Sequence, residues 1–156
     1  MTIFRNSKKR YTSVLMSIFL VITFLANSQS VMARDSQEAT LYKKPSCGCC
    51  EEYATYLRQF DYNIEVVETS QVDKFKAEYG VLPTLQSCHT MTIEGYVVEG
   101  HVPIDVLNKL LRERPEIRGI SLPGMPQGSP GMPGLKQNPF VIYEVSDGEP
   151  SIYVTN

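Results

Sequence analysis

The sequence lacks the features that mark an integral membrane or nucleic-acid-binding protein. Its longest apolar stretch, residues 14–26, has about 13 residues, whereas a helix that spans a membrane needs about 20. No cysteine directly follows this stretch, so a lipoprotein anchor is not indicated. Beyond residue 33 there is no basic run and no stripe of aromatic and basic residues. We therefore expect no nucleic-acid partner, no electrostatic membrane docking and no stable membrane anchor.

The first 33 residues are typical of a secretory signal peptide. Four basic residues lie between positions 5 and 10, the apolar stretch follows, and Val31 and Ala33 put short side chains just before Arg34. None of the 17 acidic residues lies in this segment, so its removal leaves 11 basic residues against 17 acidic ones. The sequence thus predicts export to the periplasm as a mildly acidic protein, with residues 1–33 removed.

The four cysteines lie at positions 47, 49, 50 and 88. An even number of cysteines in an exported chain usually indicates structural disulfides. Three of these cysteines fall within four residues, where they cannot connect distant parts of the chain. This crowding favours metal or redox chemistry.

The apolar periodicity after residue 38 predicts alternating strands and helices. The expected elements, in chain order, are a strand at 39–42, a helix from Cys50, a strand at 63–67, a helix from Ser70 to Gly80, a strand through Cys88, a strand at 96–99 and a helix from Pro103. This order predicts an α/β fold with a mixed sheet and helices packed on it.

The rest of the chain divides into a loop and a hairpin. Residues 115–138 are rich in glycine and proline, show little that predicts regular structure, and carry Met125 and Met132. Residues 140–145 and 151–154 predict a C-terminal β-hairpin. We place the domain at 39–145 and the end of the hairpin at 146–156.

Cys47 and Cys50 form a C-x-x-C motif at a strand-to-helix turn. The amides of the helix end and the neighbouring Lys43 and Lys44 favour thiolate over thiol there. With a Val-Leu-Pro-Thr segment about 35 residues later, the pattern resembles the thioredoxin fold. That resemblance implies a cis Leu82–Pro83 bond opposite the C-x-x-C.

Further soft donors accompany this motif. Cys49 adds a third thiol, and strand alternation from Thr84 predicts that Cys88 lies near the other cysteines. The chain has only two histidines; we take His101 as a ligand and leave His89 open. Thiolates, imidazole and the two methionine thioethers together suit copper(I).

Four segments resemble the CopG-like periplasmic family, first catalogued as a domain of unknown function. They are Cys-Gly-Cys-Cys at 47–50, Ser-Cys-His-Thr at 87–90, Glu-Gly-His-Val-Pro at 99–103, and the Met-containing loop at 123–132. The resemblance covers residues 39–145. It implies a thioredoxin-like fold, copper binding at the cysteine-rich turn and a place in copper resistance, where interconversion of copper oxidation states has been proposed.

We therefore predict a site for more than one copper(I) ion, because Cys49 and Cys50 are adjacent and point in different directions. The predicted metal ligands are Cys47, Cys49, Cys50, Cys88, His101, Met125 and Met132. Cys47 and Cys50 would be the catalytic pair if the site is redox-active. Copper ions and other periplasmic copper-handling proteins are the expected partners.

Two alternatives stay open at this point. A thiol-disulfide oxidoreductase acting on exported proteins would need only the Cys47–Cys50 pair and the cis proline. A structural zinc site with three cysteines and one histidine would account for the cysteines but not for the methionines.

The mature protein is expected to start close to Arg34, because the basic start, the apolar run and the Val-x-Ala ending agree. Intact-mass measurement on exported protein checks this. A mass that still includes residues 1–33 would show an uncleaved anchor instead.

Overall fold

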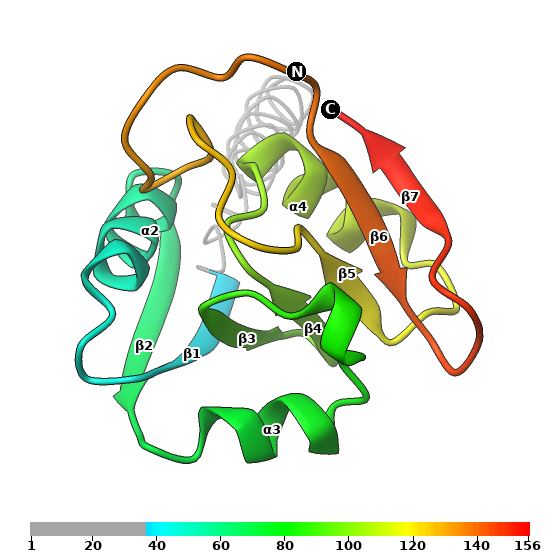
Figure 1. Cartoon of the computed structure of the whole chain (residues 1–156), viewed down its shortest axis with the longest axis horizontal. Helices are drawn as coiled ribbons and strands as arrows, with labels where there is room; N and C mark the ends of the chain where they lie inside the picture. Colours follow the sequence, from blue (N-terminus) through cyan, green and yellow to red (C-terminus); the bar gives the residue numbers. More distant parts are fainter. Residues whose placement is uncertain (1–36) are drawn as a thin grey trace, which may run out of the picture. The chain divides into compact units, whose positions relative to one another are not determined.

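The computed structural model describes residues 37–156, so the signal-peptide prediction lies outside the described residues. One seven-stranded sheet runs through this part of the chain (Figure 1). Its elements are β1 (Gln37–Lys43), α2 (Gly48–Arg58), β2 (Tyr62–Glu68), α3 (Val72–Glu78), a 3₁₀ turn η1 (Pro83–Leu85), β3 (His89–Ile93), β4 (Tyr96–Glu99), α4 (Ile104–Glu113), β5 (Gly119–Ser121), β6 (Val141–Val145) and β7 (Ile152–Thr155). None of these helices has the length and apolar character to cross a membrane.

The strand order is β2-β1-β3-β4-β5-β6-β7. The crossover through α2 makes β1 and β2 parallel, whereas β3 is antiparallel to both β1 and β4. The four strands β2-β1-β3-β4 with their three helices have the predicted β-α-β-α-β-β-α order. The α/β prediction is confirmed, with its mixed sheet, its Met-containing loop and the antiparallel hairpin of β6 and β7.

Strand β5 was not predicted. It lies within residues 115–138, where the sequence indicates a loop, pairs in parallel with β4, and connects the first four strands to the C-terminal hairpin. Its three residues are all buried, and a strand this short shows no periodicity in the sequence. Position 119 requires glycine, because a Cβ there would collide with the backbone of Val97.

Successive side chains of a strand point to opposite faces of the sheet, and helices pack on both faces. Leu41 and Met91 point into the core formed with α2 and α4. Tyr42, the next residue along β1, points to the other face, where its ring stacks on Phe75 of α3 with centroids 4.3 Å apart. The sheet is therefore covered by α2 and α4 on one side and by α3 on the other (Figure 1).

The predicted cis proline is wrong, since no peptide bond among residues 37–156 is cis. Leu82 is extended, with φ −60° and ψ 148°, as the residue before proline prefers. Pro83 then opens the 3₁₀ turn, a position that suits its fixed φ and its missing N–H. The same turn contains Thr84, so strand alternation does not begin there, and Cys88 lies one residue before β3 rather than within a strand.

The loop at residues 122–134, which we call the methionine loop, is held at several points. The Gly124 amide donates a hydrogen bond to Gln86 O at 3.2 Å, and the Ser87 hydroxyl donates to Gly124 O. Farther along, Gly131 has φ +77°, and a Cβ there would lie 2.7 Å from the Tyr53 amide nitrogen of α2. The loop therefore packs directly on the helix that carries the cysteines.

Gly131→Ala is expected to destabilise the protein more than Gly124→Ala does. Both glycines have positive φ, but nothing lies within 4 Å of a Cβ on Gly124. The left-handed conformation costs alanine about 1–2 kcal/mol at either position, and the contact with Tyr53 adds to this cost only at Gly131. Urea unfolding of the two variants measures the difference, and equal losses would contradict the close packing of the loop on α2.

Candidate metal centre

Strand register brings the site residues to one end of the sheet. Lys43 at the end of β1 pairs with His89 at the start of β3, and Thr90 pairs with Glu99 at the end of β4. The turn after β1, the residue before β3 and the residues after β4 consequently meet. These segments carry the Cys47–Cys50 motif, Cys88 and His101.

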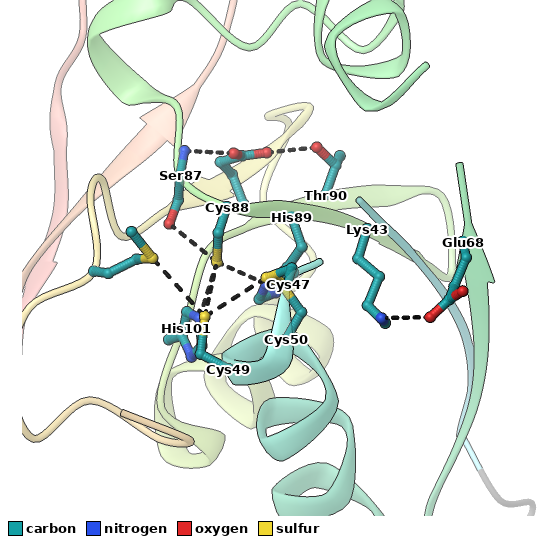
Figure 2. Close-up of a disulfide and its surroundings, with 12 residues drawn as sticks. Lys43, Cys47, Cys49, Cys50, Glu68, Ser87, Cys88, His89, Thr90 and His101 are labelled. Atoms are coloured by element: carbon teal, nitrogen blue, oxygen red, sulfur yellow. Dashed lines mark hydrogen bonds and ion pairs between the residues drawn. A yellow bond between two sulfur atoms is a disulfide. The ribbon is translucent and has the colours of Figure 1, made fainter. Parts of the chain in front are cut away.

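The four cysteine sulfurs form one cluster (Figure 2). Cys47 and Cys50 are joined as a disulfide with their Cα atoms 5.5 Å apart. The Cys49 thiol lies 3.6 Å from Cys47 Sγ and 3.9 Å from Cys88 Sγ. All four sulfurs lie within 4.8 Å of one another, so the predicted proximity of Cys88 to the motif is seen in the structure.

His101 points its Nε2 at Cys88 Sγ, 3.0 Å away. Its other ring nitrogen, Nδ1, is 2.6 Å from Pro130 O in the methionine loop. A carbonyl oxygen only accepts, so Nδ1 carries the proton and Nε2 offers its lone pair to the cluster. Burial lowers the pKa of His101, which keeps the ring neutral, as a metal ligand must be.

His89 lies near the same sulfur. Its Nδ1 lies 3.4 Å from Cys88 Sγ, and its ring stacks on Tyr53 with centroids 4.8 Å apart. The side chain is fully buried, and burial lowers its pKa well below the usual value. Among residues 37–156, its Nε2 has no hydrogen-bond partner.

The two methionines differ in their relation to the cluster. Met125 Sδ lies 3.9 Å from the Cys49 thiol, and the side chain is 49% exposed. Met132 is half-buried, and its amide donates to Ser129 O at 2.9 Å. Within residues 37–156, Met132 has no sulfur contact of the kind that Met125 makes with Cys49.

The lysines beside the motif are paired with carboxylates rather than directed at the thiols. Lys43 Nζ lies 2.8 Å from Glu68, and Lys44 Nζ lies 3.1 Å from Asp73. Their charges are thus partly neutralised, so the expected support for a thiolate from these lysines is weaker than the sequence suggested. Burial and the nearby Cys49 raise the pKa of Cys88 to about 12, which favours the thiol over the thiolate.

A buried ion pair behind the cluster was missed by the sequence analysis. Lys76 of α3 and Glu99 of β4 form a salt bridge, and both side chains are almost completely buried. Glu99 also accepts from the Ser87 amide at 2.6 Å and from the Thr90 hydroxyl at 2.7 Å. Glu99 thereby binds the residues that precede Cys88 and follow His89 in the chain. Two features of the sequence could have indicated this pair. Glu99 ends an apolar strand, and Lys76 lies four residues after Val72, on the same face of the helix.

A family model described as "Protein of unknown function, DUF411" matches residues 85–132. Two solved structures, titled "Copper resistance protein copG- Form 2" and "Copper resistance protein copG- Form 1", are each 31% identical to the chain with a TM-score of 0.72. They cover 78% of this chain, which in turn covers 99% and 98% of theirs. The chain belongs to the CopG family. A search of curated proteins finds no match.

The CopG-like cluster has the donors that a metal site requires. Four sulfurs and two neutral imidazoles converge within hydrogen-bonding or van der Waals distance, and soft ligands of this kind bind soft metal ions. The Nδ1 proton of His101 is already held by a backbone carbonyl, the arrangement that orients metal-binding histidines in proteins. These residues can bind a metal.

Lys76→Met is expected to lower the free energy of unfolding by about 3–5 kcal/mol, because it leaves the Glu99 carboxylate buried without its partner. Lys44→Met is the matched control, since it breaks an exposed pair and should cost less than about 1 kcal/mol. Adding Glu99→Gln to Lys76→Met should restore part of the loss. Urea unfolding measures all three, and equal effects of the two lysine variants would contradict the role of the buried pair.

Proposed function

We propose that this protein binds copper in the periplasm and acts in copper resistance. The observation that carries the proposal is the position of Cys49, whose thiol contacts the sulfurs of Cys47, Cys88 and Met125. A thiol surrounded by three other sulfurs on different segments is suited to bridging soft ions. The titles of the two similar structures support copper as the metal.

The donor set supports copper over zinc. A structural zinc site is closed by four ligands, and three cysteines with one histidine would complete it. That arrangement would give no role to Met125, which reaches the cluster. Thiolate, thioether and imidazole together suit copper(I).

The number of donors supports more than one ion. Cys50 is completely buried against the core, whereas its neighbour Cys49 is half-buried and faces Met125. Together with Cys47, Cys88, Met125 and His101, these two thiolates are more donors than one four-coordinate ion can use. A bridged cluster, with Cys49 shared between ions, uses all of the donors.

The Cys47–Cys50 disulfide supports coupling between copper binding and cysteine oxidation. Formation of the disulfide from two thiols releases two protons and two electrons. Two Cu²⁺ ions can accept these electrons and become two Cu⁺ ions. Since disulfide sulfurs are no longer thiolates, the oxidised protein holds fewer Cu⁺ ions than the reduced protein.

The alternative function is a thiol-disulfide oxidoreductase for exported proteins. It is favoured by the position of the Cys47–Cys50 disulfide at the start of α2, with Cys47 half-buried and Cys50 buried. The trans Leu82–Pro83 bond and the thiols of Cys49 and Cys88 next to the disulfide favour copper binding instead.

Reduced protein is expected to bind more than one Cu⁺ ion, and protein with the Cys47–Cys50 disulfide is expected to bind fewer. Titration of Cu⁺ against a competing chelator measures both states. Cys49→Ser and Cys88→Ser should each lower the stoichiometry, because each removes a thiolate of the cluster. Met125→Leu should weaken binding about tenfold or more.

Met132→Leu is the matched comparison for Met125→Leu, because in the described part of the chain Met125 and not Met132 makes a sulfur contact with Cys49. An equal loss in both variants would assign Met132 to the site as well, as the sequence predicts. If oxidised and reduced protein bind Cu⁺ equally, and only Cys47→Ser or Cys50→Ser abolishes reduction of protein disulfides, the oxidoreductase function replaces the copper function.

A further inference from the structure

The structure shows the protein with half of its cysteines oxidised. Cys47 and Cys50 form a disulfide, whereas Cys49 and Cys88 are free thiols. The two free sulfurs lie 3.9 Å apart and point toward each other in the cluster (Figure 2). Because the chain has four cysteines in all, these two thiols are the one further pair that oxidation can join within a chain.

The positions of Cys49 and Cys88 favour a bond between them. A disulfide needs about 2 Å between its sulfurs, so the two thiols have to approach by about the same distance. Cys88 lies between the 3₁₀ turn and β3, outside both elements, and Cys49 is in the first turn of α2. Rotation of two side chains at the ends of elements can supply most of this movement. Both residues are half-buried, so a small oxidant in solvent can reach them.

We infer that Cys49 and Cys88 form a second disulfide, so that the cysteines of one chain supply four electrons in two steps. Each step converts two thiols into a disulfide and releases two protons to solvent and two electrons. The electrons reduce two Cu²⁺ ions to two Cu⁺ ions, or one oxidised glutathione to two reduced glutathiones. The inference rests on the proposed function only for copper as the natural electron acceptor.

The second disulfide extends the proposed coupling between cysteine oxidation and copper release. With Cys47 and Cys50 joined, Cys49 and Cys88 still offer two thiolates to Cu⁺. Once these are joined as well, the four sulfurs of the cluster have no thiolate left, and metal binding by cysteine requires the thiolate. The first step therefore lowers the Cu⁺ capacity, and the second step releases the Cu⁺ ions that the remaining thiolates hold.

The two disulfides are expected to differ in their effect on stability. Cys47 and Cys50 are separated by 3 positions in the chain, whereas Cys49 and Cys88 are separated by 39. Closing the longer loop removes more conformational freedom from the unfolded chain. Protein with both disulfides should therefore melt about 5 °C or more above protein with the first disulfide alone.

The first experiment uses metal-free protein, so that its result does not depend on copper binding. Reduced protein is incubated with excess oxidised glutathione, the remaining thiols are blocked with iodoacetamide, and the disulfides are mapped by mass spectrometry. We expect a peptide with Cys49 joined to a peptide with Cys88. If Cys47 is joined to Cys50 while Cys49 and Cys88 carry the blocking group or glutathione, the inference is overturned.

The second experiment counts electrons. Reduced protein is mixed without oxygen with excess Cu²⁺ and an excess of a chelator that forms a coloured complex with Cu⁺. Wild-type protein should produce four Cu⁺ ions per chain, because each disulfide supplies two electrons. A count of two for the wild type contradicts the second disulfide.

Two double variants are the matched controls for this count. Cys49→Ser with Cys88→Ser keeps only the first pair, and Cys47→Ser with Cys50→Ser keeps only the second, so each should produce two Cu⁺ ions per chain. The second variant should also lose the mass of two hydrogens on oxidation without forming dimers. Dimers linked through Cys49 or Cys88 in its place would show that the two thiols do not meet within one chain.

The outcomes separate this inference from the copper-binding function. A peptide joined through Cys49 and Cys88 in metal-free protein supports the second disulfide even if reduced protein binds no Cu⁺. Free Cys49 and Cys88 after treatment with oxidised glutathione overturn it even if reduced protein binds several Cu⁺ ions.

Discussion

The register of β3 between β1 and β4 decides where the chemistry of this protein is located. Because β3 runs antiparallel to both neighbours, its first residue lies beside the last residues of the two flanking strands. Cys88, immediately before β3, thus reaches a cysteine motif that is about 40 residues distant in the chain. A register shift of two residues would move Cys88 by about 6–7 Å along the sheet and would separate it from Cys49.

The buried pair of Lys76 and Glu99 helps to hold this register at the site. Glu99 binds the Ser87 amide and the Thr90 hydroxyl on either side of Cys88 and His89, and Lys76 provides the compensating charge from α3. On the opposite face, Tyr53 of α2 packs against both histidine rings. The methionine loop completes the enclosure through Pro130 O on His101 and Met125 on Cys49. Each segment that carries a residue of the cluster is therefore held by a different part of the fold.

Much of the fold could be predicted from the sequence because its long elements have clear periodicity. Tyr53 and Leu57 are buried on the inner face of α2, and Leu107 and Leu110 on that of α4, as their spacing indicates. The errors fall where the backbone depends on distant contacts. Strand β5 exists because β4 and β6 pair with it, and the trans Leu82–Pro83 bond belongs to a 3₁₀ turn. Short elements of this kind have too few residues for local preferences to decide their conformation.

The sequence by itself determined which donors are available: three thiols in one turn, a fourth thiol between two polar residues, two histidines and a glycine-rich loop with two methionines. Residue types and spacing are sufficient for that, because softness and charge belong to the side chains themselves. The tertiary structure alone decided which donors meet. It brought Met125 to Cys49 and aimed His101 Nε2 at Cys88 through a hydrogen bond from Nδ1 to Pro130. It also buried His89 with its Nε2 unpaired among the residues that the structure describes. These contacts depend on strand register, helix packing and loop anchoring between residues far apart in the chain, which local sequence patterns do not encode.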